Sequence, residues 1–170
     1  MNAYSFLAIL SAATGLAQMQ AGAAFSAECT QERAQYVDAQ ALYELSFEAV
    51  DPESSASSHS FKVTIKNSPL VLDGYVMPSE PVHRTNGFLF NNCPEGDITG
   101  ADIAACTVWE GVIYASDNGK IDLLPQQGAN AAGQILLPNL GAALQASSAW
   151  GPKKAQVAPW DVLTLKGCRS

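Results

Sequence analysis

The stretch from Cys93 to Leu124 constrains the fold more than any other part of the chain. Cys93 and Cys106 stand close enough in sequence to close a small loop. Two runs rich in β-favouring residues follow, 107–115 and 120–124, and they flank the turn sequence Ser-Asp-Asn-Gly at 116–119. Asn and Gly accept the positive φ that tight hairpin turns require. The stretch therefore predicts a β-hairpin with a closed cysteine loop at its entrance.

The first 27 residues have the layout of a secretory signal peptide. They hold no charged side chain, and an apolar run from Tyr4 to Leu10 is followed by small residues. No Lys or Arg precedes that run, and the competing interpretation is a buried N-terminal helix. We expect a signal peptide over 1–26, cleaved near 23–27, and a single exported β-rich domain over 27–170. The run is too short for a membrane span, so we expect a periplasmic or secreted protein without membrane insertion after signal removal.

Four cysteines in an exported chain favour disulfides over free thiols. Three pairings are possible, and we expect the nested one, Cys93 with Cys106 and Cys29 with Cys168. The second bond would tie the mature N-terminus to the C-terminus. The chain has no Cys-x-x-Cys, and both histidines lie far from the cysteines in sequence, so no metal site is expected.

The net charge of −7 argues against two classes of partner. Nucleic acids and anionic lipids are recognised through clustered positive charge, which an acidic chain of this kind does not offer. We expect neither as a partner.

Alternation of apolar and polar residues predicts a mainly β fold. The clearest cases are residues 43–49 and 61–65, because successive side chains of a strand point to opposite faces. Further strands are expected over 70–77, 88–90 and 157–165, one or two helical turns within 28–40, and a short helix at 140–148 with Asn139 as its cap. The expected architecture is a small antiparallel barrel or sandwich of about six or seven strands with one or two short helices, held by disulfides.

Catalytic motifs are sparse. The chain has no Gly-x-Ser-x-Gly, no phosphate-binding glycine loop and no His-Glu-x-x-His, and we expect no cofactor. Its histidines are His59, in a serine-rich loop, and His83, beside Arg84. A hydrolase that uses Glu110 with His83 and Arg84 is therefore kept as an alternative, provided that these side chains meet in one cleft.

A binding function fits the pattern better. Asp97 and Asp102 lie inside the cysteine loop, which can offer them to a basic protein partner, as in an interaction or inhibitor module. Trp109, beside Glu110, is a candidate wall of a site for a small apolar or sugar ligand, as in a carrier. A third hypothesis is a structural envelope protein, which an extensive exposed apolar patch would support.

Overall fold

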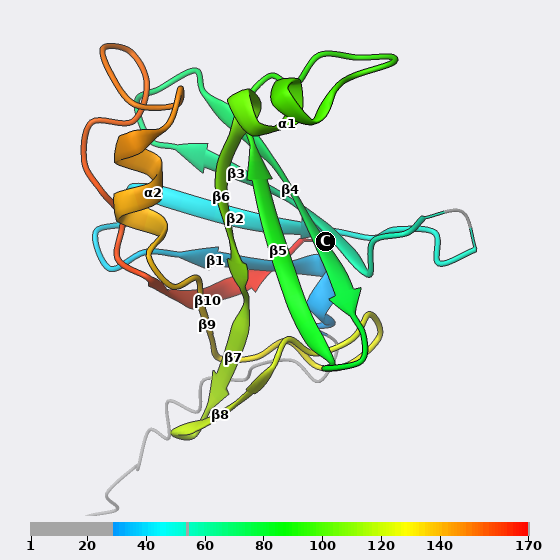
Figure 1. The fold of residues 1–170 in the computed structure, drawn as a ribbon. Helices are drawn as coiled ribbons and strands as arrows, with labels where there is room; N and C mark the ends of the chain where they lie inside the picture. Colours follow the sequence, from blue (N-terminus) through cyan, green and yellow to red (C-terminus); the bar gives the residue numbers. More distant parts are fainter. Residues whose placement is uncertain (1–28, 54, 170) are drawn as a thin grey trace, which may run out of the picture.

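The computed structural model describes residues 29–53 and 55–169, which form one curled antiparallel sheet with two α-helices (Figure 1). Ten strands lie in the order β6-β5-β4-β3-β2-β1-β10-β9-β7-β8. The elements along the chain are a 3-10 turn at Gln31–Arg33, β1 Ala34–Val37, β2 Tyr43–Glu48, β3 His59–Ile65, β4 Val71–Ser79, β5 Arg84–Phe90, α1 Gly100–Cys106, β6 Thr107–Val112, β7 Tyr114–Asp117, β8 Lys120–Leu123, β9 Gln134–Leu136, α2 Leu140–Ala146 and β10 Val162–Cys168.

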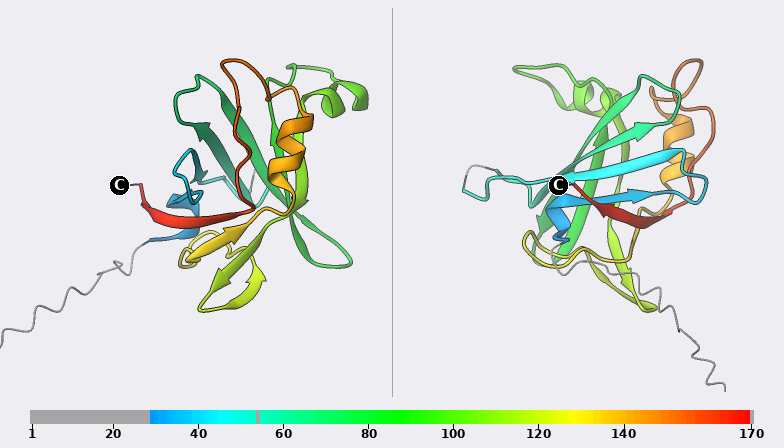
Figure 2. Two further views of the ribbon diagram at one scale, coloured as in Figure 1. Left: turned by 90° about the vertical axis from the view of Figure 1, so that its left-hand side faces the viewer. Right: turned by 180° about the vertical axis from the view of Figure 1, so that it is seen from behind.

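The sheet curls into a half-barrel because its two ends are joined along the chain (Figure 2). β6 pairs with β5 at one end, and β7 pairs with β9 near the other. Only Ile113 separates β6 from β7, and its backbone N–H donates to the carbonyl of Thr85 at 2.9 Å. The mainly β, antiparallel fold is confirmed. The expected number of six or seven strands is wrong, since ten are present among the described residues.

The concave side of the sheet is filled by a hydrophobic core rather than by a channel. Alternate residues of β2 and β3 point inward, and the rings of Tyr36, Phe47 and Phe61 pack edge-on or tilted at centroid distances of 5.9 and 5.6 Å. Gly74 makes room for one of these rings, because a Cβ there would lie 2.1 Å from Phe61. Because side chains fill the concave side, the outer face and the rim of the half-barrel are the surfaces where binding can take place.

Helix α2 packs against β6 and adds Leu140 and Leu144 to the core. Its N-terminus is capped differently from the sequence-based expectation. Asn139 has a left-handed backbone and makes no side-chain cap bond. The carboxylate of Asp161 instead accepts hydrogen bonds from the backbone N–H of Asn139 at 2.9 Å and of Leu140 at 3.2 Å. A residue 21 positions away in sequence from Leu140 thus supplies the acceptor that a helix start requires.

Three elements differ from the expected pattern. In the described part of the segment 28–40, residues 29–40, the chain forms one 3-10 turn and then β1, which is held between β2 and β10. The cysteine loop contains α1, although no helix was expected there. β5 begins at Arg84, four residues before the strand that was expected over 88–90. In the second and third cases the chain lacks the long periodic pattern that would mark the element in advance.

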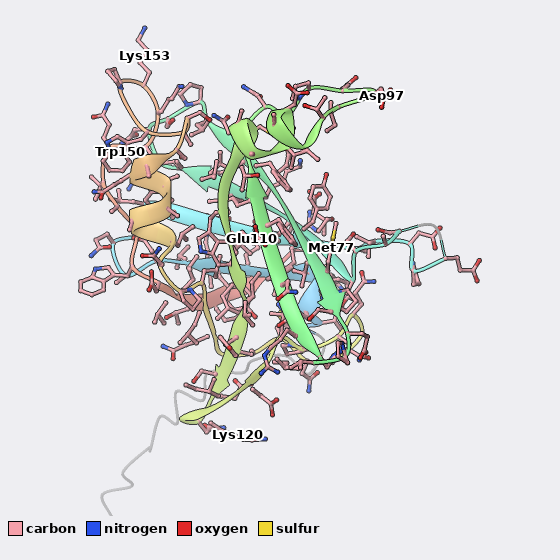
Figure 3. The ribbon with its side chains drawn as sticks, viewed as in Figure 1. Met77, Asp97, Glu110, Lys120, Trp150 and Lys153 are labelled. Carbon is pink, nitrogen blue, oxygen red and sulfur yellow. A yellow bond between two sulfur atoms is a disulfide. The ribbon has the colours of Figure 1, made fainter. Side chains whose placement is uncertain are left out.

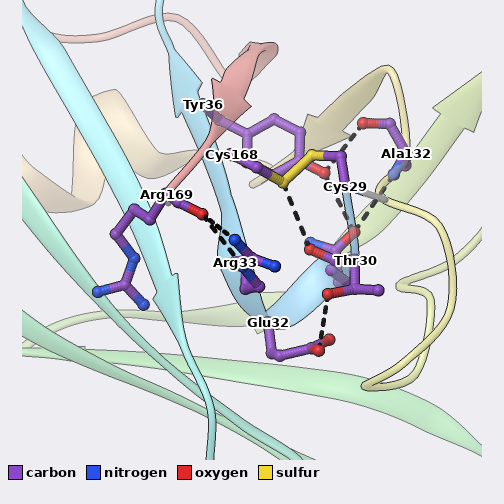
Figure 4. Close-up of a disulfide and its surroundings, with 9 residues drawn as sticks. Cys29, Thr30, Glu32, Arg33, Tyr36, Ala132, Cys168 and Arg169 are labelled. Atoms are coloured by element: carbon purple, nitrogen blue, oxygen red, sulfur yellow. Dashed lines mark hydrogen bonds between the residues drawn. A yellow bond between two sulfur atoms is a disulfide. The ribbon is translucent and has the colours of Figure 1, made fainter. Parts of the chain in front are cut away.

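Both expected disulfides are present, and no described cysteine is free. Cys29–Cys168 joins the start of the described chain to the end of β10 (Figure 4). Beside it, the Arg33 guanidinium donates to the backbone carbonyl of Arg169 at 2.7 and 3.1 Å. Two disulfides indicate an oxidising, exported environment.

None of the described helices is long and apolar enough to cross a membrane. The expected signal peptide, residues 1–26, lies outside the described residues.

Candidate functional site: the outer face of strands β4 to β6

The disulfide-closed segment places its two aspartates in different roles. Asp97 is exposed in the loop before α1, beyond one end of the sheet (Figure 3). The carboxylate of Asp102 accepts hydrogen bonds from the hydroxyl of Thr99 at 2.7 Å and from its backbone N–H at 2.9 Å. Both bonds lower the pKa of Asp102. The backbone N–H of Asp102 donates in return to the Thr99 hydroxyl oxygen at 3.3 Å, which completes a capping box. Asp97 is therefore free to meet a partner, whereas Asp102 holds the start of the helix.

The three residues of the hydrolase alternative do not meet in one cleft. His83 and Arg84 are exposed where the β4–β5 connection enters β5, and the Arg84 guanidinium donates to the backbone carbonyl of His83 at 2.9 Å. Glu110 is exposed on β6 opposite Phe88, which is four residues beyond Arg84 along β5. At roughly 3.3 Å per residue that offset is about 13 Å, too far for a shared proton transfer.

Trp109 and Glu110 are neighbours in sequence but point to opposite sides of β6. The indole of Trp109 is buried in the core and donates through Nε1 to the carbonyl of Pro138 at 2.9 Å. Trp109 therefore fixes the segment before α2 and offers no surface to a ligand. Glu110 remains on the solvent side.

A patch of large apolar side chains covers the outer surface of β4 and β5, and we call it the aromatic face. It consists of Tyr75, Met77, Phe88 and Phe90. Tyr75 and Met77 are 40% and 42% exposed. The rings of Phe88 and Phe90 stack almost parallel, 2° apart in tilt, with centroids 6.2 Å apart, and Tyr75 lies 6.3 Å from Phe90.

The aromatic face follows from strand alternation. Leu72, Val76 and Leu89 fill the core, so the residues between them along β4 and β5 must face outward. The alternation along β4 and β5 could have predicted which residues form this face. It did not do so, because the short apolar run at 88–90 has no polar residue to mark which side faces water.

Three exposed carboxylates lie beside this face or beyond its end, and we call these three, Glu95, Asp97 and Glu110, the acidic rim. Glu110 is paired directly across from Phe88 on the neighbouring strand. Glu95 and Asp97 lie in the segment that leaves the end of β5 just after Phe90. All three are exposed. The surroundings of the aromatic face are thus predominantly negative.

The other charges near this face are a lysine–aspartate pair and one arginine. The Lys62 ammonium lies 2.6 Å from the carboxylate of Asp73, which is opposite Phe90 on β4. The hydrogen bond that Lys62 donates to Asp73 raises the pKa of Lys62, and the pair is close to neutral as a unit. Arg84 is exposed on the same side of β5 as Phe88, four residues before it, so one positive charge stands against the three carboxylates of the acidic rim.

The segment that carries part of the acidic rim is firmly attached. Cys93–Cys106 closes it at its base, and the backbone N–H of Asn91 donates to the carbonyl of Cys106 at 2.9 Å. The side-chain amide of Asn91 donates to the hydroxyl of Ser148 at 3.1 Å, which joins the segment to the end of α2. The rim is therefore held in place before any partner arrives.

Comparisons of the chain with protein-family models, with curated proteins and with solved structures found no match.

Proposed function

We propose that this chain is a periplasmic or secreted binding domain that captures a basic, partly apolar segment of another protein on the aromatic face. The observation that carries the proposal is a cluster of packed aromatic rings on paired strands, with Tyr75 exposed and Phe88 and Phe90 half-buried, next to exposed carboxylates. Aromatic residues and Met are enriched in protein interfaces, and contiguous exposed apolar patches mark such sites.

The rigidity of the face favours binding. The rings project from paired strands, and the segment with Glu95 and Asp97 is closed by a disulfide. Little conformational entropy is lost when such a surface binds, so more of the contact energy appears as affinity. The partner buries apolar surface by packing its own side chains against and beside the rings.

The acidic rim determines the sign of the charge that a partner must carry. A segment with Lys or Arg side chains would be drawn to Glu95, Asp97 and Glu110, while its apolar side chains cover the rings. A second copy of this chain is a poor occupant, because two acidic rims would face each other. The proposal therefore commits to a different, basic protein.

The direct test uses isothermal titration calorimetry on the mature, oxidised chain. The probe is a synthetic peptide that alternates lysine with leucine, compared with the same peptide carrying glutamate in place of lysine. We expect the basic peptide alone to bind, and its affinity to fall as salt is added, because the charges at the rim are screened.

Matched variants locate the site. Tyr75→Ser should weaken binding about tenfold, as expected for a central aromatic contact, whereas Trp160→Ser, another exposed aromatic change, should have no effect. Glu110→Lys should weaken binding and flatten its salt dependence, whereas Glu53→Lys, in the loop between β2 and β3, should not. Equal binding of the acidic and basic peptides, or equal effects of Tyr75→Ser and Trp160→Ser, would refute the proposal.

The structural envelope hypothesis is the second candidate, because the same exposed apolar face is the feature that would support it. Sedimentation velocity distinguishes the two. A binding domain for a basic partner stays monomeric as its concentration rises, and a structural protein associates with itself through this face.

A further inference from the structure

A second surface, at the rim of the half-barrel, has the opposite charge. A recess of about 250 Å³ lies between the start of β2, the end of β3 and the segment that follows α2. Three of the chain's six lysines line it, Lys66, Lys153 and Lys154. None of the nine described residues around it is acidic. In a chain with a net charge of −7, this concentration of positive charge stands out from its surroundings.

The lysines of the recess are available to a ligand. Among the described residues, the lysines that form ion pairs are Lys62, Lys120 and Lys166, which all lie outside it. Lys154 donates to the backbone carbonyl of Ser148 at 2.7 Å. An ammonium group carries three donors, so Lys154 keeps two for another acceptor.

The segment that supplies two of these lysines is fixed in shape. The backbone N–H of Gly151 donates to the carbonyl of Ala155 at 3.0 Å, and the N–H of Lys154 donates back to the carbonyl of Gly151 at 3.0 Å. These bonds close a tight loop in which Lys153 has a positive φ of 62°. The charges therefore stand on a closed loop rather than on an extended tail, as Figure 3 shows for Lys153.

Two contacts hold this loop against the sheet. The hydroxyl of Ser68 donates to the carbonyl of Lys153 at 3.1 Å, across the top of the β3–β4 turn. The hydroxyl of Tyr43 donates to the carbonyl of Val157. Burial and the nearby carboxylate of Asp38 raise the pKa of Tyr43 to about 12, so its hydroxyl keeps its proton and continues to donate. The recess is thus formed before a ligand enters.

The walls of the recess combine charge with apolar surface. Leu42, Ile65 and Val157 contribute apolar side chains beside the lysines. The volume is below the roughly 300–1,000 Å³ of sites for drug-sized ligands, so the ligand is small. We propose that this recess binds a small organic oxyanion, a phosphate or carboxylate group attached to a short apolar body, with the lysines on the oxyanion and the apolar walls on the body.

The test uses phenyl phosphate as the probe and the mature, oxidised chain labelled with ¹⁵N. When phenyl phosphate is added, we expect the backbone amide signals of Leu42, Ile65 and Val157 in the chain to shift. Inorganic phosphate lacks the apolar body and benzyl alcohol lacks the charge. Each should therefore bind more weakly than phenyl phosphate by about tenfold or by a larger factor.

The chain offers a matched control for charge. The variant with Lys66, Lys153 and Lys154 all changed to Ala should bind phenyl phosphate about tenfold more weakly. Changing the other three lysines, Lys62, Lys120 and Lys166, alters the net charge equally and should leave the affinity within about twofold. Equal losses in the two variants, equal binding of inorganic phosphate, or no shift at the recess would overturn the proposal. Thermal unfolding of both variants confirms that they fold.

Discussion

The two disulfides should differ in their contribution to stability because they close loops of very different length. Cys29 and Cys168 are 139 positions apart, and Cys93 and Cys106 are 13 apart. In the chain-entropy account, cross-linking removes about 5 kcal/mol of unfolded-state entropy for the long loop and about 3 kcal/mol for the short one. Changing the pair Cys29 and Cys168 to Ala should therefore cost about 2 kcal/mol more than changing the other pair.

Equilibrium unfolding in urea, followed by tryptophan fluorescence, measures this difference. With an m-value of about 2 kcal/mol/M, the unfolding midpoint should fall by about 2.5 M without the long-range bond and about 1.5 M without the short one. The reverse order, or equal losses, would refute the reasoning, because it would show that native-state contacts around each bond outweigh loop length.

The peptide-binding assay should rank the same two variants in the opposite order. Cys93–Cys106 fixes the segment that carries Glu95 and Asp97, whereas Cys29–Cys168 lies at the chain ends. Loss of the short-range bond should weaken binding of the basic peptide more, although it costs less stability.

Three further predictions concern single residues. Thr99→Ala removes the hydroxyl that caps α1 and should lower stability by about 1 kcal/mol, with faster hydrogen exchange in the helix. Burial lowers the pKa of His59 below the unfolded value of 6.5, so stability should be full above that pH and decline as the pH falls below it. His59→Gln should flatten the dependence of the urea midpoint on pH, whereas His83→Gln, at an exposed site, should not. Gly74→Ala forces a Cβ into a core ring and should cost about 1–3 kcal/mol by the same urea assay, whereas Gly100→Ala, with open space around it, should not destabilise.

The parts of the fold that follow from local pattern were predictable. β2 and β3 show strict alternation, and the β7–β8 hairpin has Asn118 and Gly119 with positive φ at its turn. Disulfides were predictable from the even cysteine count, and the nested pairing expected among the three possible ones is confirmed. In each case the information lies within a few neighbouring residues or in a small set of combinations.

The parts that depend on tertiary partners were not predictable. β1 is a strand because β2 and β10 flank it, and Asp161 caps α2 from a distant position. The aromatic face and the lysine recess each gather residues from separate elements, and no spacing rule brings these residues together. Sequence reasoning found Asp97 and Glu110 as candidate binding residues but could not tell that Glu110 lies beside the aromatic face and Asp97 beyond its end.

The most direct test of the central claim is a ¹⁵N NMR titration of the mature, oxidised chain with the basic lysine–leucine peptide. The account predicts that the largest amide shifts fall on β4, β5 and β6, around Tyr75, Phe88 and Glu110, and that they shrink as salt is added. Shifts concentrated on β8 and β10, or a response that ignores salt, would contradict it.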